Sequence, residues 1–333
     1  MDLTKQFTAK ITGTGSYLPE KVLTNNDLAK IVDTSDEWIR TRTGITQRRM
    51  ADQETATSDL ATKAAERAIE DAGITAEDID LIIVATATPD MAFPSTACIV
   101  QKNIGAINAS AFDLEAACTG FLYGLTIGEQ FIKTGFYKRI LIIGAEVLTK
   151  VLDWKDRNTC VLFGDGAGAV ILERSEEGDG ILSSYLGSDG KSGECLTLPG
   201  GGSRLPASYE TIDNRLHYIK MEGTEVFKFA VRVMGSSALK ALEGSNIKLE
   251  EVDFLVPHQA NIRIIEAAAK RLHLSMDKVY VNLDQYGNMS AASVPVALDE
   301  AVKKGCIKKG DVVVLVAFGG GLTWGSSVIK WSK

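Results

Sequence analysis

Two stretches, Asp80-Leu-Ile-Ile-Val and Asp253-Phe-Leu-Val-Pro, decide the fold because they are matching parts of one pattern that the chain contains twice. Each is apolar without polar alternation after its first residue, which predicts a strand buried on both faces of a parallel sheet. Each also follows a segment with helical spacing, residues 57–71 in the first case and residues 224–242 in the second. The sequence therefore predicts a helix followed by a buried parallel strand, in two places 173 residues apart.

A second helix and a second apolar strand follow each of these strands. Residues 119–133 have helical spacing and lead to the strand that begins at Arg139, whereas residues 290–304 lead to the strand that begins at Asp311. The offset between the copies stays between 170 and 173 residues for all four elements. Because four elements recur in one order at a nearly constant offset, the sequence predicts an α/β protein that is internally duplicated.

The duplication divides the chain into residues 1–174 and residues 175–333. Residues 173–215 connect the halves and are rich in Gly, Ser, Asp and Pro. This connection is longer than an ordinary loop, so we expect it to contain short strands or to cover a site.

Composition and charge exclude several classes of protein. The 333 residues are 45% hydrophobic, which excludes a disordered chain, and the net charge of −7 argues against a general nucleic-acid binder. The first residues lack the pattern of a signal peptide, and no apolar run approaches the roughly 18 residues of a membrane span. We therefore expect a cytoplasmic protein that has neither a nucleic acid nor a membrane as its partner.

The cysteine pattern predicts neither disulfides nor a metal site. The chain has five cysteines, an odd number without a C-x-x-C pair, and only three histidines that could assist a metal. We expect one cysteine to be a reactive thiol and the others to be small buried residues. The five are Cys98, Cys118, Cys160, Cys195 and Cys306.

Two glycine-rich stretches could be mistaken for nucleotide-binding loops. Such a loop must be followed by a helix whose amides hold the phosphates. The stretch Gly164-Asp-Gly-Ala-Gly168 is instead followed by the apolar residues of a strand, and Gly13-Thr-Gly15 is followed by a polar stretch with Pro19. We therefore expect tight turns at both places and no phosphate loop.

Cys118 stands where an apolar strand ends and a helix begins, within Glu115-Ala-Ala-Cys-Thr-Gly120. The free amides and the positive end of that helix would lower the pKa of the thiol and favour the reactive thiolate. A cysteine between alanines is more often a small buried residue, so this hypothesis depends on the surrounding residues.

Small residues recur every four positions in the helix after Cys118 and in the matching helix of the second copy. Glycine costs roughly 1 kcal/mol relative to Ala inside a helix, so a stripe of three indicates that another element packs very closely. We expect the two helices to pack on each other and to bring together Cys118 and Asn288, which are equivalent at an offset of 170. The stripes are Gly120, Gly124 and Gly128 in the first helix, and Ser293, Ala297 and Ala301 in the second.

His258 and Asn288 are the candidates to act with Cys118. His258 follows the buried strand of the second copy, at the edge of the sheet where α/β proteins place ligand sites. A lone histidine is more often structural, and His217 and His273 fit that description. A thiol, an imidazole and an amide that converge from three strand ends form a credible nucleophilic site.

A last glycine cluster, Phe318-Gly-Gly-Gly-Leu-Thr-Trp-Gly325, follows the final buried strand. Backbone amides without side chains in the way suit an oxyanion hole, although glycine clusters also form plain turns between strands. The position of the cluster at a strand end favours the oxyanion hole.

Four motifs together resemble β-ketoacyl-acyl-carrier-protein synthase III, and the resemblance extends over essentially the whole chain. It implies the thiolase fold, in which two similar halves form a five-layer αβαβα arrangement, and it implies a homodimer. The motifs are Ala116-Ala-Cys-Thr-Gly120, Pro257-His-Gln-Ala-Asn-Ile-Arg263, Tyr286-Gly-Asn-Met-Ser-Ala-Ala-Ser293 and Phe318-Gly-Gly-Gly-Leu-Thr-Trp-Gly325.

The resemblance implies a decarboxylating Claisen condensation that initiates fatty-acid synthesis. Cys118 would take the acyl group from a short acyl-CoA, and malonyl-acyl-carrier protein would then lose CO2 and attack this thioester to give 3-oxoacyl-acyl-carrier protein. His258 and Asn288 would donate hydrogen bonds to the enolate oxygen, and the amides of Cys118 and Gly320 would form the oxyanion hole of the acyl-enzyme. No cofactor is implied, because the CoA thioester is a substrate.

The resemblance also implies residues that bind the substrates. Trp38, Arg42 and Arg157 match residues that hold the CoA nucleotide, and Asn261 matches a residue that lines the pantetheine tunnel.

The acyl pocket and the carrier-protein surface come from the same resemblance. Phe93 would cross a dimer interface to bound the acyl pocket, to which we also assign Phe318. Basic residues on two helices could dock the acidic carrier protein, although they could equally be a solvated helix face. These residues are Lys228, Arg232, Arg263, Lys270 and Arg271.

Other classes of protein account for the motifs less well. Related condensing enzymes of polyketide or hydroxymethylglutaryl-CoA synthesis share a Cys, a His and sometimes an Asn, and they are the alternative. A thiolase would need a second cysteine where Phe318 stands. A papain-like hydrolase has no reason for a duplicated α/β chain, and an inactive scaffold protein would not need all three reactive residues.

Overall fold

The computed structural model describes residues 7–175 and 179–333. The strands are β1 (Thr8–Tyr17), β2 (Val22–Thr24), β3 (Gln47–Arg49), β4 (Leu81–Ala85), β5 (Ser110–Leu114), β6 (Arg139–Val147), β7 (Asp165–Ser175), β8 (Gly180–Ser188), β9 (Leu196–Thr197), β10 (Lys220–Met221), β11 (Phe254–Pro257), β12 (Val312–Gly319) and β13 (Thr323–Lys330). The α-helices are α1 (Asn25–Leu28), α2 (Asp36–Thr43), α3 (Thr57–Ala72), α4 (Thr96–Ile104), α5 (Gly120–Lys133), α6 (Arg157–Cys160), α7 (Tyr209–Asp213), α8 (Gly223–Ser245), α9 (Ile262–Arg271), α10 (Leu283–Tyr286) and α11 (Ser293–Lys303). Short 3-10 helices are η1 (Ala76–Asp78), η2 (Ala117–Thr119), η3 (Leu148–Val151), η4 (Gly190–Cys195), η5 (Leu249–Glu251), η6 (Met276–Lys278) and η7 (Ser290–Ala292).

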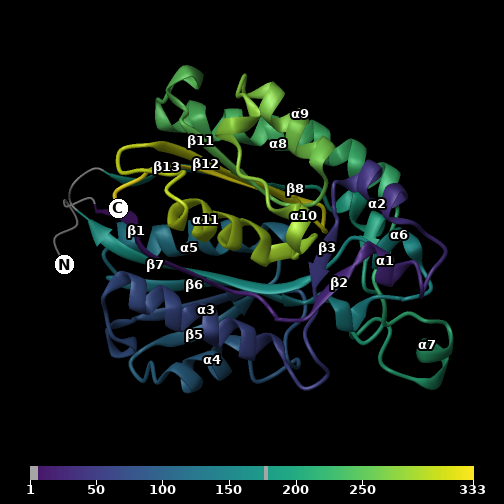
Figure 1. The fold of residues 1–333 in the computed structure, drawn as a ribbon. Helices are drawn as coiled ribbons and strands as arrows, with labels where there is room; N and C mark the ends of the chain where they lie inside the picture. The colour runs from purple at the N-terminus through teal and green to yellow at the C-terminus, as the bar shows by residue number, and fades with distance from the viewer. Residues whose placement is uncertain (1–6, 176–178) are drawn as a thin grey trace.

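Two sheets and three layers of helices alternate through the molecule (Figure 1). The first sheet has the strand order β1-β7-β6-β4-β5, and the second has the order β11-β12-β13-β8. Helices α3 and α4 cover the outer face of the first sheet, α8 and α9 cover the outer face of the second, and α5 and α11 lie between the sheets (Figure 1). This is the five-layer αβαβα arrangement that the resemblance implied, so the predicted fold class is confirmed.

The two sheets repeat one pattern of strand directions. In the first, β1, β7 and β6 run antiparallel to their neighbours, and β4 and β5 continue in parallel from β6. In the second, β8, β13 and β12 are antiparallel in the same succession, β11 is parallel to β12, and a single parallel bridge joins Leu255 to Val279 beyond it. The predicted internal duplication is therefore confirmed by the topology.

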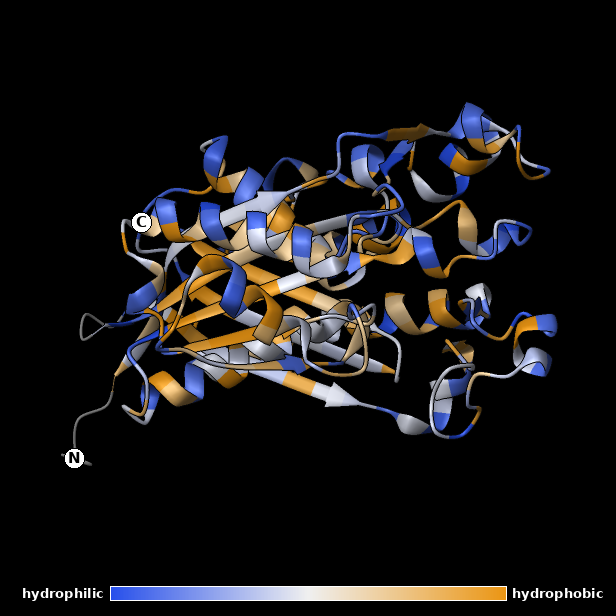
Figure 2. Ribbon diagram, turned by 90° about the horizontal axis from the view of Figure 1, so that it is seen from below, coloured by the Kyte–Doolittle hydropathy of each residue, from blue (hydrophilic) through white to orange (hydrophobic). Residues whose placement is uncertain are grey.

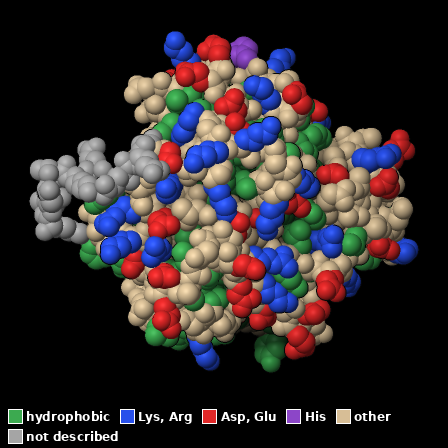
Figure 3. All heavy atoms as spheres, turned by 60° about the vertical axis from the view of Figure 1, so that its left-hand side comes forward, with side chains coloured by type: hydrophobic (Ala, Val, Ile, Leu, Met, Phe, Trp, Pro, Cys, Tyr) green, Lys and Arg blue, Asp and Glu red, His purple; other side chains and the backbone are tan. Residues whose placement is uncertain are grey.

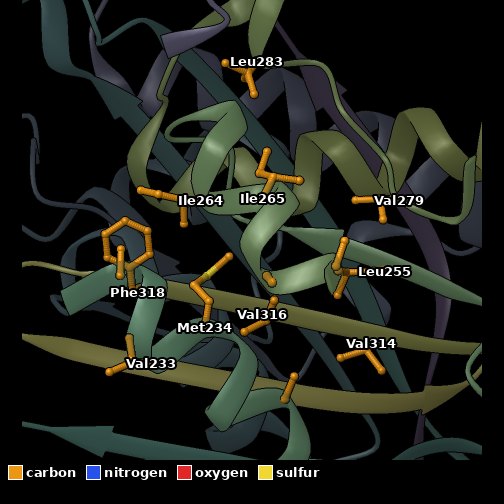
Figure 4. Packing of buried hydrophobic residues seen from close by; sticks show 14 of the residues in the cluster. Val233, Met234, Leu255, Ile264, Ile265, Val279, Leu283, Val314, Val316 and Phe318 are labelled. Carbon is orange, nitrogen blue, oxygen red and sulfur yellow. The ribbon is translucent and has the colours of Figure 1, made fainter. Parts of the chain in front are cut away.

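Apolar runs place the strands in the interior. Every residue of β4, β11 and β12 is buried, as expected for strands with helices on both faces. Figure 2 shows hydrophobic residues along the strands of both sheets and hydrophilic stripes on the outer helices. Figure 4 shows how Met234 of α8 and Ile264 and Ile265 of α9 pack on Leu255 and Val316 of the second sheet. This packing holds α8 and α9 on the second sheet.

The two glycine-rich stretches are not turns, so this prediction is wrong. Gly13 and Gly15 lie inside β1, and Gly164 directly precedes β7, which contains the rest of that stretch. A Cβ atom on Gly13 or Gly15 would collide with the backbone of Ala68 in α3. Glycine is required here because the helix lies on the strand at backbone contact distance, not because the chain reverses.

The glycine stripe of α5 also has a different partner from the one predicted. A Cβ atom on Gly124 would lie 3.1 Å from Ile142 Cγ2 in β6, and one on Gly128 would lie 3.0 Å from Leu172 Cδ1 in β7. The stripe therefore faces the first sheet and not α11. The expected packing of this stripe on α11 is therefore wrong, although α5 and α11 share the central layer (Figure 1) and contribute to one hydrophobic cluster.

The surface carries charges of both signs. Figure 3 shows Lys and Arg side chains interspersed with Asp and Glu side chains on the face beside the chain ends. In the part of the chain that the structure describes, no helix is both long enough and apolar enough to cross a membrane.

Replacing Gly15 by Ala should destabilise the fold. The added Cβ would lie 2.9 Å from the Arg67 carbonyl carbon and closer still to the backbone of Ala68, and a backbone cannot move aside as a flexible side chain can. We expect a loss of about 1–3 kcal/mol in the free energy of unfolding, measured by urea denaturation. Gly190→Ala is the control, because nothing lies within 4 Å of its Cβ position. An equal effect of the two substitutions would contradict the close-contact explanation.

Candidate active site

Cys118 lies in the turn that leads into the central helix α5. It is the middle residue of η2 and is 6% exposed. The turn is tight, because Ala117 has a φ of +47° and its amide N–H donates to Glu115 Oε1 at 2.9 Å. The Thr119 hydroxyl donates to the Ala116 carbonyl at 2.6 Å. These bonds hold the thiol at the N-terminal end of α5.

The thiol opens onto a pocket of about 500 Å³. Ser290 and Gly320 line this pocket together with Cys118, and so do Leu196 and Leu198 of the connection between the halves. The expectation that this connection covers a site and contains short strands is confirmed. The other lining residues are Ala87, Glu115, Ala116, Ala117, Leu148, Phe163, Thr197, Ile219, Gly321 and Thr323.

The second half contributes η7, which lies against η2. Both η2 and α5 begin 173 residues before their counterparts η7 and α11, as β6 does before β12. The counterpart of Cys118 is therefore Ala291, and the predicted equivalence of Cys118 with Asn288 is wrong. The glycines that follow the two helices gave the offset of 170. This offset is three residues smaller than the offset of the helix starts because α11 is three residues shorter than α5.

His258 follows β11 and is almost completely buried, with 1% of its surface exposed. Its backbone N–H donates to the Val316 carbonyl of β12 at 2.8 Å, and its ring packs edge-on against Phe318 at 5.5 Å. Neither ring nitrogen has a hydrogen-bond partner among the described residues. Burial lowers the pKa of His258 to about 3, so the imidazole is neutral near pH 7.

Asn288 is 7% exposed and is held by its backbone between the two halves. Its N–H donates to the Leu162 carbonyl at 2.9 Å, and its carbonyl accepts from Gly164 N–H at 3.0 Å. Its side-chain Oδ1 accepts from Ser290 N–H at 2.8 Å. This leaves Nδ2 as the donor group of the side chain.

The end of β12 joins His258 to Cys118. His258 contacts Val316 and Phe318 of this strand, and a Cβ atom on the next residue, Gly319, would lie 2.7 Å from the Cys118 backbone nitrogen. Cys118, Gly320 and Ser290 share the pocket, whereas His258 and Asn288 are not among its lining residues. The structure thus brings the three predicted residues into one buried region without a direct hydrogen bond between their side chains.

The protonation state of Cys118 differs from the prediction. Burial raises the pKa of the thiol to about 12, and the Glu146 and Glu115 carboxyls act in the same direction, so the thiol is neutral near pH 7. Sequence reasoning considered only the helix end and missed the loss of water around the sulfur. Cys98 and Cys306 are exposed, so the expectation that the remaining cysteines are buried is also wrong in part.

The four residues assigned to CoA lie together at one edge of the molecule. The Arg42 guanidinium lies 4.6 Å from the centroid of the Trp38 ring, and both residues are on α2. The Arg157 guanidinium of α6 lies 5.2 Å from the same centroid. Asn261, the N-cap of α9, donates from Nδ2 to the Arg42 carbonyl at 2.9 Å. Three cationic or aromatic groups from two helices, α2 and α6, therefore form one surface suited to a nucleotide and its phosphates.

Phe318, assigned to the acyl pocket, is not among the lining residues, whereas the prediction for Phe93 concerns the pocket of a second copy and stays a prediction. Phe93 is 84% exposed, on the segment between β4 and α4. Phe318 is 5% exposed, and its ring packs against His258 and the core rather than into the pocket. The assignment of Phe318 is therefore corrected: it supports the imidazole from the side.

The basic residues assigned to carrier-protein docking are all exposed, on the packed helices α8 and α9. Lys228 forms an ion pair with Glu225 at 2.8 Å. Arg271 lies over Gly235 of α8, whose missing side chain makes room for it. The structure thus places Lys228 and Arg232 on α8, and Arg263, Lys270 and Arg271 on the helix α9 that packs against it.

Sequence reasoning missed two residues of the site, Glu146 and Ser290. Glu146 of β6 is completely buried, and burial raises the pKa of its carboxyl to about 7. Its only sequence signal was a single charged residue near the end of an apolar strand. Ser290 is buried in the left-handed region, with a φ of +46°. Residues 7–175 and 179–333 contain no cluster of three His, Cys, Asp or Glu side chains that could hold a metal ion.

Two family models match the chain. The model of 3-oxoacyl-[acyl-carrier-protein (ACP)] synthase III matches residues 112–190, and the model of the C-terminal part of the same enzyme matches residues 242–331. A curated relative, β-ketoacyl-[acyl-carrier-protein] synthase III of Caldanaerobacter subterraneus subsp. tengcongensis, is 65% identical over 329 residues, which are 99% of each chain.

Solved structures share the whole fold. The 3-oxoacyl-[acyl-carrier-protein] synthase III from Aquifex aeolicus VF5 has a TM-score of 0.90 and 50% identity, and the match covers 97% of this chain and 100% of that one. The priming β-ketosynthase from the R1128 polyketide pathway has a TM-score of 0.91 at 32% identity, covering 99% and 98% of the two chains. The fold does not separate these two classes, but the sequence identity favours the first.

The buried Glu146 should make stability depend on pH. Its pKa is raised from 4.5 to about 7 in the folded state, so the folded chain holds this proton more tightly than the unfolded chain does. Stability should therefore fall as pH rises from about 4.5 to about 7, by up to ~1.4 kcal/mol per pH unit. Glu146→Gln removes this dependence, so its unfolding free energy relative to the unmodified protein should rise over that range and then stay level.

Urea denaturation at pH 5, 6, 7 and 8 tests this difference. Asp165→Asn is the comparison, because burial raises the pKa of Asp165 to about 6 and its window should lie lower. A stability difference for Glu146→Gln that stays the same at all four pH values would show that the carboxyl does not titrate there.

Proposed function

Because the chain belongs to the β-ketoacyl-[acyl-carrier-protein] synthase III family, we propose that Cys118, His258 and Asn288 divide the two half-reactions of its condensation between them. The enzyme is an acyltransferase of fatty-acid synthesis. It condenses a short acyl-CoA with malonyl-acyl-carrier protein to give 3-oxoacyl-acyl-carrier protein, CoA and CO2. The observation that supports this division is the end of β12, against which the Cys118 thiol turn and the neutral His258 ring both pack.

In the first half-reaction, Cys118 Sγ attacks the carbonyl carbon of the acyl-CoA, and CoA leaves as the acyl-enzyme forms. The negative charge that develops on the carbonyl oxygen requires donors that are already in place. The amides of Cys118 and Gly320 suit this role, because both residues line the pocket where the thioester must lie. The apolar lining from Leu196, Leu198 and Ile219 suits a short alkyl chain and keeps water from the thioester.

In the second half-reaction, the malonyl group loses CO2, and the charge moves onto its thioester oxygen as an enolate. A neutral imidazole can donate an N–H to this oxygen, and a low pKa keeps His258 in that neutral form at pH 7. Asn288 Nδ2 is the second donor. The enolate carbon then attacks the Cys118 thioester and releases the thiol. No cofactor is required, because both carbon units arrive as activated thioesters.

The cluster around Trp38 would hold the CoA nucleotide. The adenine can stack on the indole ring, and the guanidinium groups of Arg42 and Arg157 can pair with the phosphates. Asn261, bonded to the Arg42 carbonyl, would line the path of the pantetheine arm. The acidic carrier protein would dock on the basic side of α8 and α9.

The protein would act as a homodimer in the cytoplasm. Phe93 and Met91 are exposed beside the start of α4, where Asp113 of the edge strand β5 accepts from Thr96 and Ala97 N–H, and Phe112 of that strand is also exposed. An open sheet edge with apolar residues favours pairing with a second copy. Phe93 of the partner subunit would then close the acyl pocket. The five unpaired cysteines suit a reducing compartment.

The two half-reactions should separate by mutation. His258→Ala and Asn288→Ala should still form an acyl-enzyme from acyl-CoA but release CO2 from malonyl-acyl-carrier protein about 10²–10³-fold more slowly, the scale of losing one preorganised donor. Cys118→Ala should form no acyl-enzyme and keep some decarboxylation. Intact-protein mass spectrometry and labelled CO2 release measure the two steps.

His273→Ala is the control for these variants, since His273 is exposed and away from the pocket. Loss of acylation in His258→Ala with unchanged decarboxylation would reverse the roles proposed for His258 and would make it the base for Cys118.

Replacing Trp38 by Ala should weaken acyl-CoA binding without changing the rate of decarboxylation. We expect the KM for acyl-CoA to rise about tenfold and decarboxylation of malonyl-acyl-carrier protein by the preformed acyl-enzyme to stay unchanged. Steady-state kinetics with each substrate varied in turn makes the comparison. Arg40→Ala is the matched control, because Arg40 lies on the same helix with its side chain 59% exposed. An equal loss in both half-reactions would contradict a role confined to CoA.

A further inference from the structure

Glu146 is a completely buried carboxyl that the two half-reactions leave unused. It accepts hydrogen bonds from the turn after β4: Thr88 Oγ1 donates at 2.6 Å, Thr86 Oγ1 at 3.2 Å and Ala87 N–H at 3.2 Å. Burying a carboxyl is costly even with these partners. A buried carboxyl in the region of the nucleophile is therefore a candidate for a role in the reaction.

Strand geometry turns Glu146 toward the nucleophile. Side chains alternate along β6, so Glu146 shares a face with Gly144. Gly144 lies against the Ala291 backbone of η7, whereas Ala145 and Val147 belong to the cluster on the opposite face. η7 in turn packs on η2, which carries Cys118. The carboxyl therefore lies on the side of the sheet that faces the thiol.

Ser290, the first residue of η7, lies between the two groups. η7 packs on η2, which carries Cys118, and the Ser290 hydroxyl lowers the pKa both of the Cys118 thiol and of the Glu146 carboxyl, as a neighbour of the two groups would. The position of Ser290 is well defined, because its N–H donates to Asn288 Oδ1 at 2.8 Å. Ser290 also lines the pocket. Ser290 thus lies beside the turn that carries the buried thiol, influences the buried carboxyl, and lines the space where the acyl-CoA must lie.

We propose that Cys118, Ser290 and Glu146 form a proton relay in which Glu146 is a positioning residue that stores the thiol proton during acyl transfer. This inference rests on the proposed role of Cys118 as the nucleophile. When Sγ forms its bond to the acyl carbon, its proton passes to Ser290 Oγ, and the Ser290 proton passes to the Glu146 carboxylate. When the bond from the acyl carbon to the CoA sulfur breaks, the CoA thiolate takes the electron pair and receives a proton from Ser290, which recovers its own from Glu146.

The protonation states of the site suit this route. The thiol is neutral at rest, so its proton must be removed inside the pocket. His258 at pKa about 3 is a poor acceptor, whereas a carboxyl at about 7 can both take and return a proton near neutral pH. Titratable groups on neighbouring segments include Glu115, before η2, and Asp165 of β7, whose carboxylate accepts from Thr149 and from Ala51 N–H. Helices α5 and α11, which also pack on β6, carry the buried carboxyls Glu129 and Asp299.

A purely structural role for Glu146 makes the opposite prediction. The Glu146 charge raises the pKa of the Cys118 thiol. If the carboxyl only held the turn at residues 86–88, Glu146→Gln would remove that charge, ease formation of the thiolate and leave acylation equal or faster. If Glu146 accepts the proton, the same substitution must slow acylation.

Single-turnover acylation from acetyl-CoA, followed by intact-protein mass spectrometry between pH 6 and pH 9, tests the relay. The unmodified enzyme should show a rate that rises through about pH 7 and then levels. Glu146→Gln should be about 10²-fold slower at pH 7.5, and its rate should climb with pH without that plateau, because only direct loss of the thiol proton remains. Ser290→Ala should behave in the same way, and it keeps the test valid if Glu146→Gln fails to fold.

Asp165→Asn is the matched control, because Asp165 is a buried carboxyl that a Thr hydroxyl and backbone amides hold, and it is not among the residues that line the pocket. It should keep the normal profile. Acylation of Glu146→Gln at the normal rate or faster, or a normal pH profile in Ser290→Ala, would overturn the relay. Peptide mapping of the adduct separates this failure from a wrong nucleophile: in the first case the acyl group is on Cys118, and in the second it is on another residue.

Discussion

The short helix η7 lies so close to strand β6 that a Cβ atom on Gly144 would collide with the backbone of Ala291. The second sheet repeats this approach, since a Cβ atom on Gly319 would lie 2.7 Å from the Cys118 nitrogen. Backbones can come this near only where glycine stands. These two contacts hold η2 and η7, the turns that precede α5 and α11, in the central layer. The pocket, the buried thiol and the imidazole beside β12 all depend on this closeness.

Burial then sets the chemistry of the site. Withdrawing water disfavours every charged form, so the thiol and the imidazole are both neutral near pH 7, and the pKa of the Glu146 carboxyl is raised to about 7. A neutral imidazole is a hydrogen-bond donor for an enolate rather than a cation, and a neutral thiol needs an acceptor within the pocket. The division of labour among the residues therefore follows from desolvation more than from any single charge pair.

The sequence predicted the structure correctly where a pattern depends on residues that are close together in the chain. The apolar runs of β4 and β12 show no polar alternation because helices cover both faces of each sheet. The recurrence of such runs at a nearly constant offset predicted the duplication. The prediction of a turn at Gly13 and Gly15 is wrong, because both lie inside β1. A glycine that permits a turn and a glycine that admits a helix look identical in the sequence. Only the position of α3 distinguishes them.

The sequence by itself determined the two α/β halves, the place of Cys118 between a strand and a helix, and the strand end that carries His258, because each follows from local spacing. Only the tertiary structure decided that Ala291 is the counterpart of Cys118, that Trp38 meets Arg157, and that the thiol is neutral. These facts depend on distances and dielectric surroundings between groups far apart in the chain, and no periodicity records them.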